Sequence, residues 1–212
     1  AKIFASTGNI ELRVGDDIST DPASEILAAG PVDIYGDDVN LDPGTGTTIV
    51  LRGQIIAAKF NPALGHLIRV FGHTDADSIT FDGTDLGAKT RAFGSENLSA
   101  TDGPDGEDTF TVQSLKSMNV TSGHTLTLDG QAQSDTYLVW TTGSRGDRRN
   151  YVVNVLDTGV VNDGVDVVSV FGADNPAASD TTPTDDIFLL RRATSIPNET
   201  ADRPGYVALV HG

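Results

Sequence analysis

Apolar and polar residues alternate along most of the chain, in short runs that often end on glycine. A period of two places successive side chains on opposite faces of a β-strand, so each run predicts a strand with one buried face. Helical periodicity is nearly absent, and the best candidate helix, of about two turns, is residues 22–29. The expected strands lie at residues 10–14, 32–35, 49–52, 67–71, 90–93, 126–129 and 168–171.

The glycines that end the first five of these strands are almost evenly spaced. They stand at positions 15, 36, 53, 72 and 94, with separations of 21, 17, 19 and 22 residues. Gly130 and Gly172 follow at separations of 36 and 42 residues, close to twice that step. A repeating step of this kind is typical of a chain whose coils stack one on another.

A second motif is an aspartate that leads directly into an apolar strand. Four such aspartates are separated by 31, 27 and 31 residues. This spacing is longer than the glycine step, so we expect more than one strand per coil, with the aspartate at a corner. The motif occurs at Asp77, Asp108, Asp135, Asp166 and Asp186.

Together the two motifs predict an all-β fold, a parallel β-helix (β-solenoid) over residues 1–190. Residues 191–212, which contain Pro197 and Pro204, are expected to form a C-terminal tail, cap or linking arm. The alternative is an antiparallel β-sandwich or jelly roll. Its hairpins would use Asp-Gly turns, for which residues 82–83, 129–130 and 163–164 qualify.

Composition narrows the classes of function. The 212 residues carry a net charge of −16 and no cysteine, which excludes disulfides and Cys-ligated metals. The acidity comes from 25 Asp against 5 Glu, and Asp prefers turns. Nucleic-acid binding is disfavoured because basic residues cluster only at Arg145, Arg148 and Arg149. The chain has no apolar run of about 18 residues, so membrane insertion is not expected. Because it begins with Ala1, we interpret it as a piece of a longer polypeptide.

Two N-terminal segments have a familiar order of strand, glycine and aspartate. They are residues 8–16 (GNIELRVGD) and 32–37 (VDIYGD). This order resembles the repeats of very large secreted bacterial proteins of the filamentous-haemagglutinin and adhesin type. The resemblance implies a right-handed parallel β-helix that serves as a stiff extracellular rod.

Residues 103–111 (GPDGEDTFT) are similar to the calcium-binding nonapeptide of RTX proteins, and residues 162–168 keep only its last part. In that family, tandem motifs share calcium between successive turns of the chain. Calcium prefers several oxygen ligands, which Asp clusters and glycine-rich turns supply. The alternative is that these Asp side chains cap turns and keep a β protein soluble. The candidate calcium ligands are Asp102, Asp105, Asp108, Asp75, Asp77, Asp163 and Asp166.

Catalytic residues are not expected. The four histidines show no metal-binding spacing, and motifs for nucleophilic or nucleotide chemistry are missing. The carboxylate pairs Asp75/Asp77 and Asp185/Asp186 would suit an enzyme that cleaves acidic polysaccharides. However, such pairs occur at turns throughout the chain, and its negative charge would repel a polyuronate.

The sequence therefore favours a non-catalytic structural element of an extracellular or cell-surface bacterial protein, with calcium as the candidate stabilising ion. Such an element would be a rod, a matrix or adhesive segment, or a filament-forming repeat. Both termini are strand-like, so we expect end-to-end self-association or covalent neighbouring repeats. The alternative function is a polysaccharide-binding or polysaccharide-cleaving β-helix protein, which makes a surface glycan the other candidate partner.

Overall fold

The computed structural model describes residues 1–38, 43–57, 67–95, 106–116, 118–119, 122–141, 151–159, 164–172, 187–192 and 205–210. These residues form strands and no α-helix. The first strands are β1 (Lys2–Ala5), β2 (Ile10–Arg13), β3 (Ile18–Ser19), β4 (Glu25–Ala28), β5 (Val32–Tyr35), β6 (Thr48–Leu51), β7 (Gln54–Ala57) and β8 (Ile68–Phe71). They are followed by β9 (Ser78–Leu86), β10 (Thr90–Phe93), β11 (Thr109–Leu115), β12 (Leu126–Asp129), β13 (Thr136–Thr141), β14 (Val153–Leu156), β15 (Val167–Gly172), β16 (Ile187–Arg192) and β17 (Gly205–Val210).

The first sheet has six strands in the order β2-β5-β8-β10-β12-β14, and every neighbouring pair is parallel. The register is continuous across the sheet, because one residue of each strand aligns with the corresponding residue of the next. The aligned residues are Ile10, Val32, Ile68, Thr90, Leu126 and Val153.

The second sheet has nine strands and follows the path β1-β4-β7-β9-β11-β13-β15, while β6 joins β3 to β9. Its pairs are parallel as well. The long strand β9 pairs with β6 through its first half and with β7 near its end. One continuous row of aligned residues comprises Thr48, Ser78, Thr109, Thr136 and Val167.

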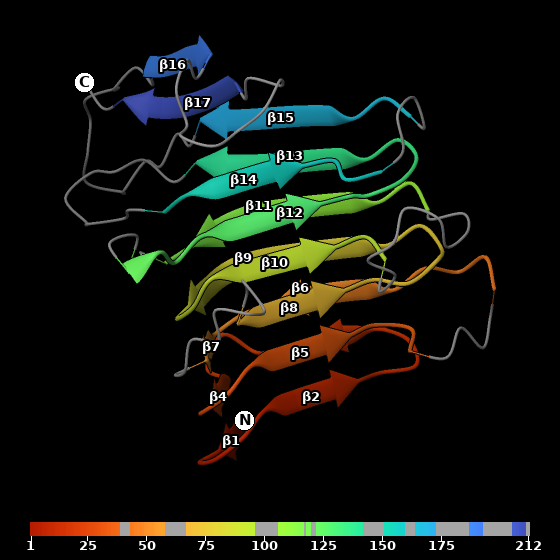
Figure 1. Ribbon diagram of the computed structural model, residues 1–212, viewed down its shortest axis with the longest axis vertical. Coiled ribbons are helices and arrows are strands. Elements are labelled where there is room, and N and C mark those ends of the chain that lie inside the picture. The colour runs from red at the N-terminus through yellow and green to blue at the C-terminus, as the bar shows by residue number, and fades with distance from the viewer. Residues whose placement is uncertain are drawn as a thin grey trace.

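The chain passes alternately through the two sheets. Each strand of the first sheet is followed in sequence by strands of the second, and we call such a set a level. Parallel neighbours need a crossover connection, and here the strands of the other sheet provide it. Figure 1 shows the levels stacked along the longest axis, from β1 and β2 at the red end to β15, beyond which β16 and β17 lie at the blue end.

The hydrophobic core lies between the sheets. Alternate residues of each strand face inward, as in β6 and β9, where Ile49, Leu51, Ile79 and Phe81 are at most 1% exposed. Fully burying an aliphatic or aromatic side chain contributes about 1.5–3 kcal/mol, so a core of this length supplies much of the stability. Its other fully buried members include Val32, Ile34, Ile55, Ile68, Val70, Phe110, Leu126, Leu128 and Tyr137.

The structure confirms an all-β chain with parallel strands. Among the described strands, only β16 and β17 pair antiparallel, as a separate two-stranded sheet. Two of the Asp-Gly pairs proposed as hairpin turns do not form them, because residues 82–83 lie inside β9 and Asp129 ends β12. The predicted boundary between residues 190 and 191 falls within β16.

Two local predictions were wrong. Residues 25–28 form β4 and not a helix, because Ile26 and Ala28 alternate inward and pair with strands on both sides. The glycine step also mixed the two sheets, since the strand before Gly53 is β6 of the second sheet while most of the others belong to the first. The described residues include no helix long and apolar enough to cross a membrane.

Candidate functional site

The most distinctive polar feature is a row of aspartates at the start of the second-sheet strands. Asp77, Asp108, Asp135 and Asp166 immediately precede β9, β11, β13 and β15, and we call them the aspartate ladder. The register of these strands places each aspartate next to the one in the following level. The first three are only 2%, 2% and 1% exposed, whereas Asp166 is half-buried, so most of the ladder lies inside the stack.

Each ladder aspartate is bonded to the next. The backbone N–H of Asp77 donates to Oδ1 of Asp108 (2.8 Å), that of Asp108 to Oδ1 of Asp135 (2.9 Å), and that of Asp135 to Oδ1 of Asp166 (2.9 Å). A carboxylate in the interior is costly unless it accepts hydrogen bonds, and these bonds offset that cost. The ladder therefore joins successive levels through side chains, in addition to the backbone bonds of the sheet.

Glycines make room for the ladder carboxylates. Gly72, Gly94 and Gly130 follow the first-sheet strands β8, β10 and β12. A Cβ atom at these positions would lie 2.0, 1.8 and 1.8 Å from Oδ2 of the ladder aspartate in the same level. The glycine and the aspartate of the two sequence motifs therefore pack against each other at one corner, where the chain passes from the first sheet to the second.

The ladder has a different residue at its N-terminal side. In the level that precedes Asp77, Thr47 occupies the ladder position. The N–H of Thr47 donates to Oδ1 of Asp77 (2.6 Å). The Thr47 hydroxyl donates to the backbone carbonyl of Asp16 (2.8 Å), which holds the corresponding position one level earlier. The carboxylate of Asp17 accepts the N–H of Thr48 (2.7 Å). Side chains therefore continue to bond the levels where the aspartates stop.

Burial perturbs the titration of Asp77, the first aspartate of the ladder. Desolvation raises the pKa of Asp77 to about 6, while hydrogen bonds from the N–H groups of His73 and Thr47 act in the opposite direction. The charge of the nearby Asp37 raises it further. A raised carboxyl pKa is also a mark of catalytic acids, so the surroundings of the group must decide between catalysis and structure.

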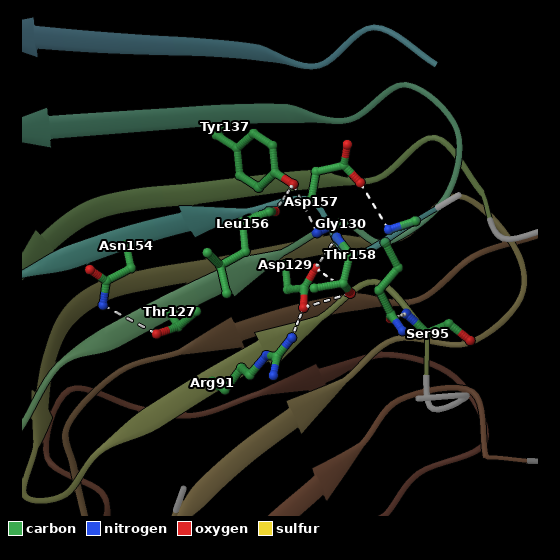
Figure 2. Close-up of polar contacts among 12 residues, drawn as sticks. Arg91, Ser95, Thr127, Asp129, Gly130, Tyr137, Asn154, Leu156, Asp157 and Thr158 are labelled. Atoms are coloured by element: carbon green, nitrogen blue, oxygen red, sulfur yellow. Dashed lines mark hydrogen bonds and ion pairs between the residues drawn. The ribbon is translucent and has the colours of Figure 1, made fainter. Parts of the chain in front are cut away.

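A second buried carboxylate lies at the end of β12. Asp129 is fully buried, forms an ion pair with Arg91 and accepts hydrogen bonds from the N–H (3.1 Å) and hydroxyl (3.0 Å) of Thr158. Desolvation lowers the pKa of Arg91. Figure 2 shows Arg91 and Thr158 converging on Asp129. This group again connects neighbouring levels.

The buried hydroxyl of Tyr137 ties the two sheets together at this corner. It donates to the carbonyl of Leu156 (3.0 Å) and accepts from the N–H of Gly130 (2.8 Å) (Figure 2). Burial raises the pKa of Tyr137, so its hydroxyl stays protonated at neutral pH. The ring of Tyr137 stacks on that of Phe110, with centroids 5.3 Å apart.

Aromatic and basic side chains form rows on the other face of the first sheet. The rings of Tyr35, Phe71 and Phe93 stack with centroids 4.7 and 4.9 Å apart. Arg13 and Arg91 lie over Tyr35 and Phe93 at 4.0 and 4.3 Å from the ring centroids. Like residues therefore stack in register from level to level, which stabilises a parallel sheet.

The candidate calcium ligands do not gather into one centre within the described residues. Asp77, Asp108 and Asp166 belong to the ladder, where their carboxylates accept backbone N–H groups. Asp75 accepts the N–H of Gly44 (2.9 Å). The described parts of the chain contain no group of three or more His, Asp or Glu that could hold a metal. Asp102, Asp105 and Asp163 lie outside the described residues.

The buried polar contacts described above also involve Asp135, Asp129, Arg91 and Tyr137, which were not among the candidate site residues. For Asp135 the signal was present, because it repeats at the same spacing as the other ladder aspartates. For the others the sequence carries no such signal, since their partners lie between 7 and 38 residues away at no repeating distance. The carboxylate pair Asp185/Asp186 lies outside the described residues.

Comparison with known proteins finds no matching family model, no matching curated protein and no matching solved structure. The candidate function therefore rests on the chain's own residues and geometry.

Proposed function

We propose that this chain is a segment of right-handed parallel β-helix that acts as a non-catalytic structural element of an extracellular or cell-surface protein. Its role would be that of a rod, a matrix or adhesive segment, or a filament-forming repeat. Two parallel sheets whose strands alternate along the chain support the β-helix. The extracellular setting and the right-handed coil rest on the resemblance to bacterial adhesin repeats.

The aspartate ladder is the observation that carries the structural role. Asp77 has the raised pKa of a catalytic acid, yet the buried ladder carboxylates accept N–H groups of neighbouring levels. A catalytic carboxylate must reach the substrate directly or through one water, and a carboxyl buried in the stack does not. The same hydrogen bonds join each level to the next, which is the arrangement that a rod of stacked levels needs.

The proposal can be tested by shape and by chemistry. Small-angle X-ray scattering of the monomer should fit a rod, and far-ultraviolet circular dichroism should show strands without substantial helix. Incubation with neutral and acidic polysaccharides should release no new sugar ends. A compact particle would overturn the rod. Release of sugar that is abolished by Asp75→Asn or Asp77→Asn, with the fold retained, would overturn the non-catalytic role.

A second candidate function, polysaccharide binding, is favoured by one partly exposed aromatic pair. Trp140 of β13 and Phe171 of β15 stack with centroids 4.6 Å apart, and Phe171 is 39% exposed. Aromatic faces of this kind stack on sugar rings. Trp140 is the only tryptophan, so its fluorescence should change when a polysaccharide binds. An unchanged spectrum across a polysaccharide panel would remove this candidate.

Calcium stabilisation remains a proposal for the segment of sequence that contains Asp102 and Asp105. The experiment is a melting curve with calcium chloride and another with EGTA. A calcium-binding loop predicts a higher Tm with calcium, since a ligand that binds the folded state stabilises it. Asp105→Asn should remove that difference, while Glu107→Gln, on an exposed neighbour, should not. Equal melting temperatures in the two buffers would exclude calcium.

A further inference from the structure

The outer face of the second sheet carries hydroxyl groups in two rows. In β6, β9, β11 and β13 alternate residues face the core, so the residues between them face outward. The register of the four strands aligns these outward residues in two rows, which we call the hydroxyl face. The first row is Thr48, Ser78, Thr109 and Thr136, and the second row is Val50, Thr80, Thr111 and Leu138.

The hydroxyl face lies in the middle of the stack. Strand β6 lies between β3 and β9, and β13 lies between β11 and β15, so none of the four strands is an edge. Thr48 is exposed, and the other seven residues of the face are half-buried. Within the described part of the chain, no hydrogen bond to a protein group engages the six hydroxyls of the face. These hydroxyls are therefore available to a ligand.

The face has no charged residue, although the chain carries a net charge of −16. Beyond the second row, Arg52 and Asp82 form an ion pair (2.9 Å), so their charges offset each other. Beyond the first row lies the exposed Glu107, and Asp17 continues that row one level earlier. These two carboxylates would repel an acidic ligand, so the face suits an uncharged one.

Threonine is common on exposed strands, and the first sheet therefore provides a comparison within the same chain. Its outward positions in β2, β5, β8, β10 and β12 hold mainly charged and aromatic residues. They are Glu11, Arg13, Asp33, Tyr35, Arg69, Phe71, Arg91, Phe93, Thr127 and Asp129. The hydroxyl rows are thus a property of one face and not of every outward strand position in this protein.

An aromatic pair borders the hydroxyl face. Trp140 follows Leu138 on the same side of β13, and its ring stacks on that of Phe171 in β15 with centroids 4.6 Å apart. Ligand sites combine an apolar surface with a few polar groups that fix orientation. A sugar has both C–H and hydroxyl groups, so the second sheet offers a surface for each, side by side.

The spacing of the rows favours an extended ligand. Neighbouring strands lie about 4.8 Å apart, so each row repeats its hydroxyls at that interval along the stack. One sugar unit of an extended β-linked polysaccharide has nearly this length. An extended chain that lies along the stack would present one sugar to each strand, whereas a coiled α-linked chain would lose this register.

From the rows, their lack of charge and their spacing we propose that the hydroxyl face binds an extended, uncharged polysaccharide whose chain runs along the stack. The inference rests on the second candidate function, polysaccharide binding, and specifies its ligand. The row hydroxyls hydrogen-bond to sugar hydroxyls, and Trp140 contacts the C–H groups of one sugar. Each added sugar meets a further strand until the four strands of the face are covered.

The test is isothermal titration calorimetry of the full chain with cello- and chito-oligosaccharides of two to six sugars. The site variant is Thr80→Val/Thr111→Val, which removes two hydroxyls and keeps side chains that suit a strand. The matched control is Ser6→Ala/Thr7→Val, which removes two exposed hydroxyls between β1 and β2. Maltohexaose supplies the sugar of cellohexaose in a coiled chain, and oligogalacturonate supplies a charged chain.

At least one uncharged β-linked series should bind, with an affinity that rises from the disaccharide to the tetrasaccharide and changes little beyond it. The site variant should bind about tenfold more weakly, the loss expected for one or two hydrogen bonds, and the control should bind like the wild type. Tighter binding of maltohexaose or oligogalacturonate would overturn an extended, uncharged ligand. An affinity that does not depend on chain length would overturn the alignment along the stack.

Two further outcomes separate this inference from the function on which it rests. Equal binding by the site variant and the control would overturn the hydroxyl face, while polysaccharide binding itself would stand. No binding to either β-linked series would also overturn the inference. If the fluorescence of Trp140 is then unchanged with every polysaccharide, the second candidate function fails as well.

Discussion

A buried aspartate that accepts backbone N–H groups does the work of a peptide carbonyl. At the corner between the sheets the strands have not yet begun to pair, so backbone donors there need another acceptor. Asp108 and Asp135 supply it in adjacent levels. The short side chain matters, because it holds the carboxylate close to its own strand and over the glycine of the same corner.

Removing one ladder carboxylate should cost stability. Asp108→Ala leaves the N–H of Asp77 buried without its acceptor, and such a loss costs about 1–3 kcal/mol. Glu107→Ala is the matched control, since Glu107 is exposed and next in sequence. Urea unfolding followed by circular dichroism measures both. Equal unfolding free energies for the two variants would contradict a stabilising ladder.

The corner glycines should not tolerate a methyl group. In Gly94→Ala the new Cβ would lie 1.8 Å from Oδ2 of Asp108 and 2.6 Å from the carbonyl of Gly130. Overpacking of this severity should cost about 3 kcal/mol or more. Gly15→Ala is the control, because a Cβ there meets nothing within 4 Å. If both variants melt at the wild-type temperature, the carboxylate does not pack against Gly94.

Asp77 should make stability depend on pH between about 4 and 6. Because its folded pKa is raised from 3.8 to about 6, its contribution is full below pH 3.8 and is lost as pH rises through 6. The size of that loss is about 3 kcal/mol. Unfolding free energies of wild type and Asp77→Asn, measured from pH 4 to 7, isolate the effect. The wild type should lose stability relative to the variant as pH rises, and parallel curves would refute the raised pKa.

At the scale of strands, alternation correctly predicted most elements, because the period of two survives wherever one face is buried. It could not predict which sheet a strand joins, since alternate residues face inward in strands of both sheets, as in β8 and β11, and only the pairing partners differ. The helix expected at residues 22–29 failed for a related reason. In so short a segment the apolar residues fit both periods, and pairing of β4 with β1 and β7 decided the outcome.

The candidate site was predictable to the extent that it repeats. The ladder spacing of 31, 27 and 31 residues is visible in the sequence, and so are the glycines. That Gly94 packs against Asp108 is not visible, because more residues separate these two in the sequence than separate Gly72 from Asp77. Contacts that cross levels, such as Arg91 with Asp129, need the register of the sheet.

The hydrogen bonds of the Tyr137 hydroxyl, which link the second sheet to the first, should contribute to the free energy of unfolding. Tyr137→Phe leaves the N–H of Gly130 without its acceptor and should destabilise the chain by about 1–3 kcal/mol. Tyr35→Phe is the control, because Tyr35 is half-buried on the other face and its ring stacking is preserved. Denaturant midpoints report the difference. A smaller loss for Tyr137→Phe than for Tyr35→Phe would contradict the connection.

For the whole molecule, the stack makes stability depend on position along its axis. Central levels have neighbours on both sides, whereas β2 and β14 have one. Stacked architectures open from their ends because each unit contacts only its neighbours.

Native-state hydrogen exchange of the monomer should follow this gradient. The amides of Thr109 and Asp108 in the centre should exchange most slowly, and those of Val153 and Val168 at the C-terminal end should exchange early. Uniform exchange across all levels would contradict a stack that opens from its ends.

The direction of the ladder bonds bears on how such a chain can change its length during evolution. Every ladder N–H points to the following level, and the donor and the acceptor stand 27 or 31 residues apart. We call the 27 or 31 residues from one ladder aspartate to the next an interval. If one interval is duplicated or deleted, each aspartate still meets an equivalent partner, so the gene can gain or lose whole intervals without further substitutions. A deletion of half an interval would put a first-sheet strand where a second-sheet strand belongs. Insertions and deletions that survive selection should therefore span whole intervals of about 27 or 31 residues.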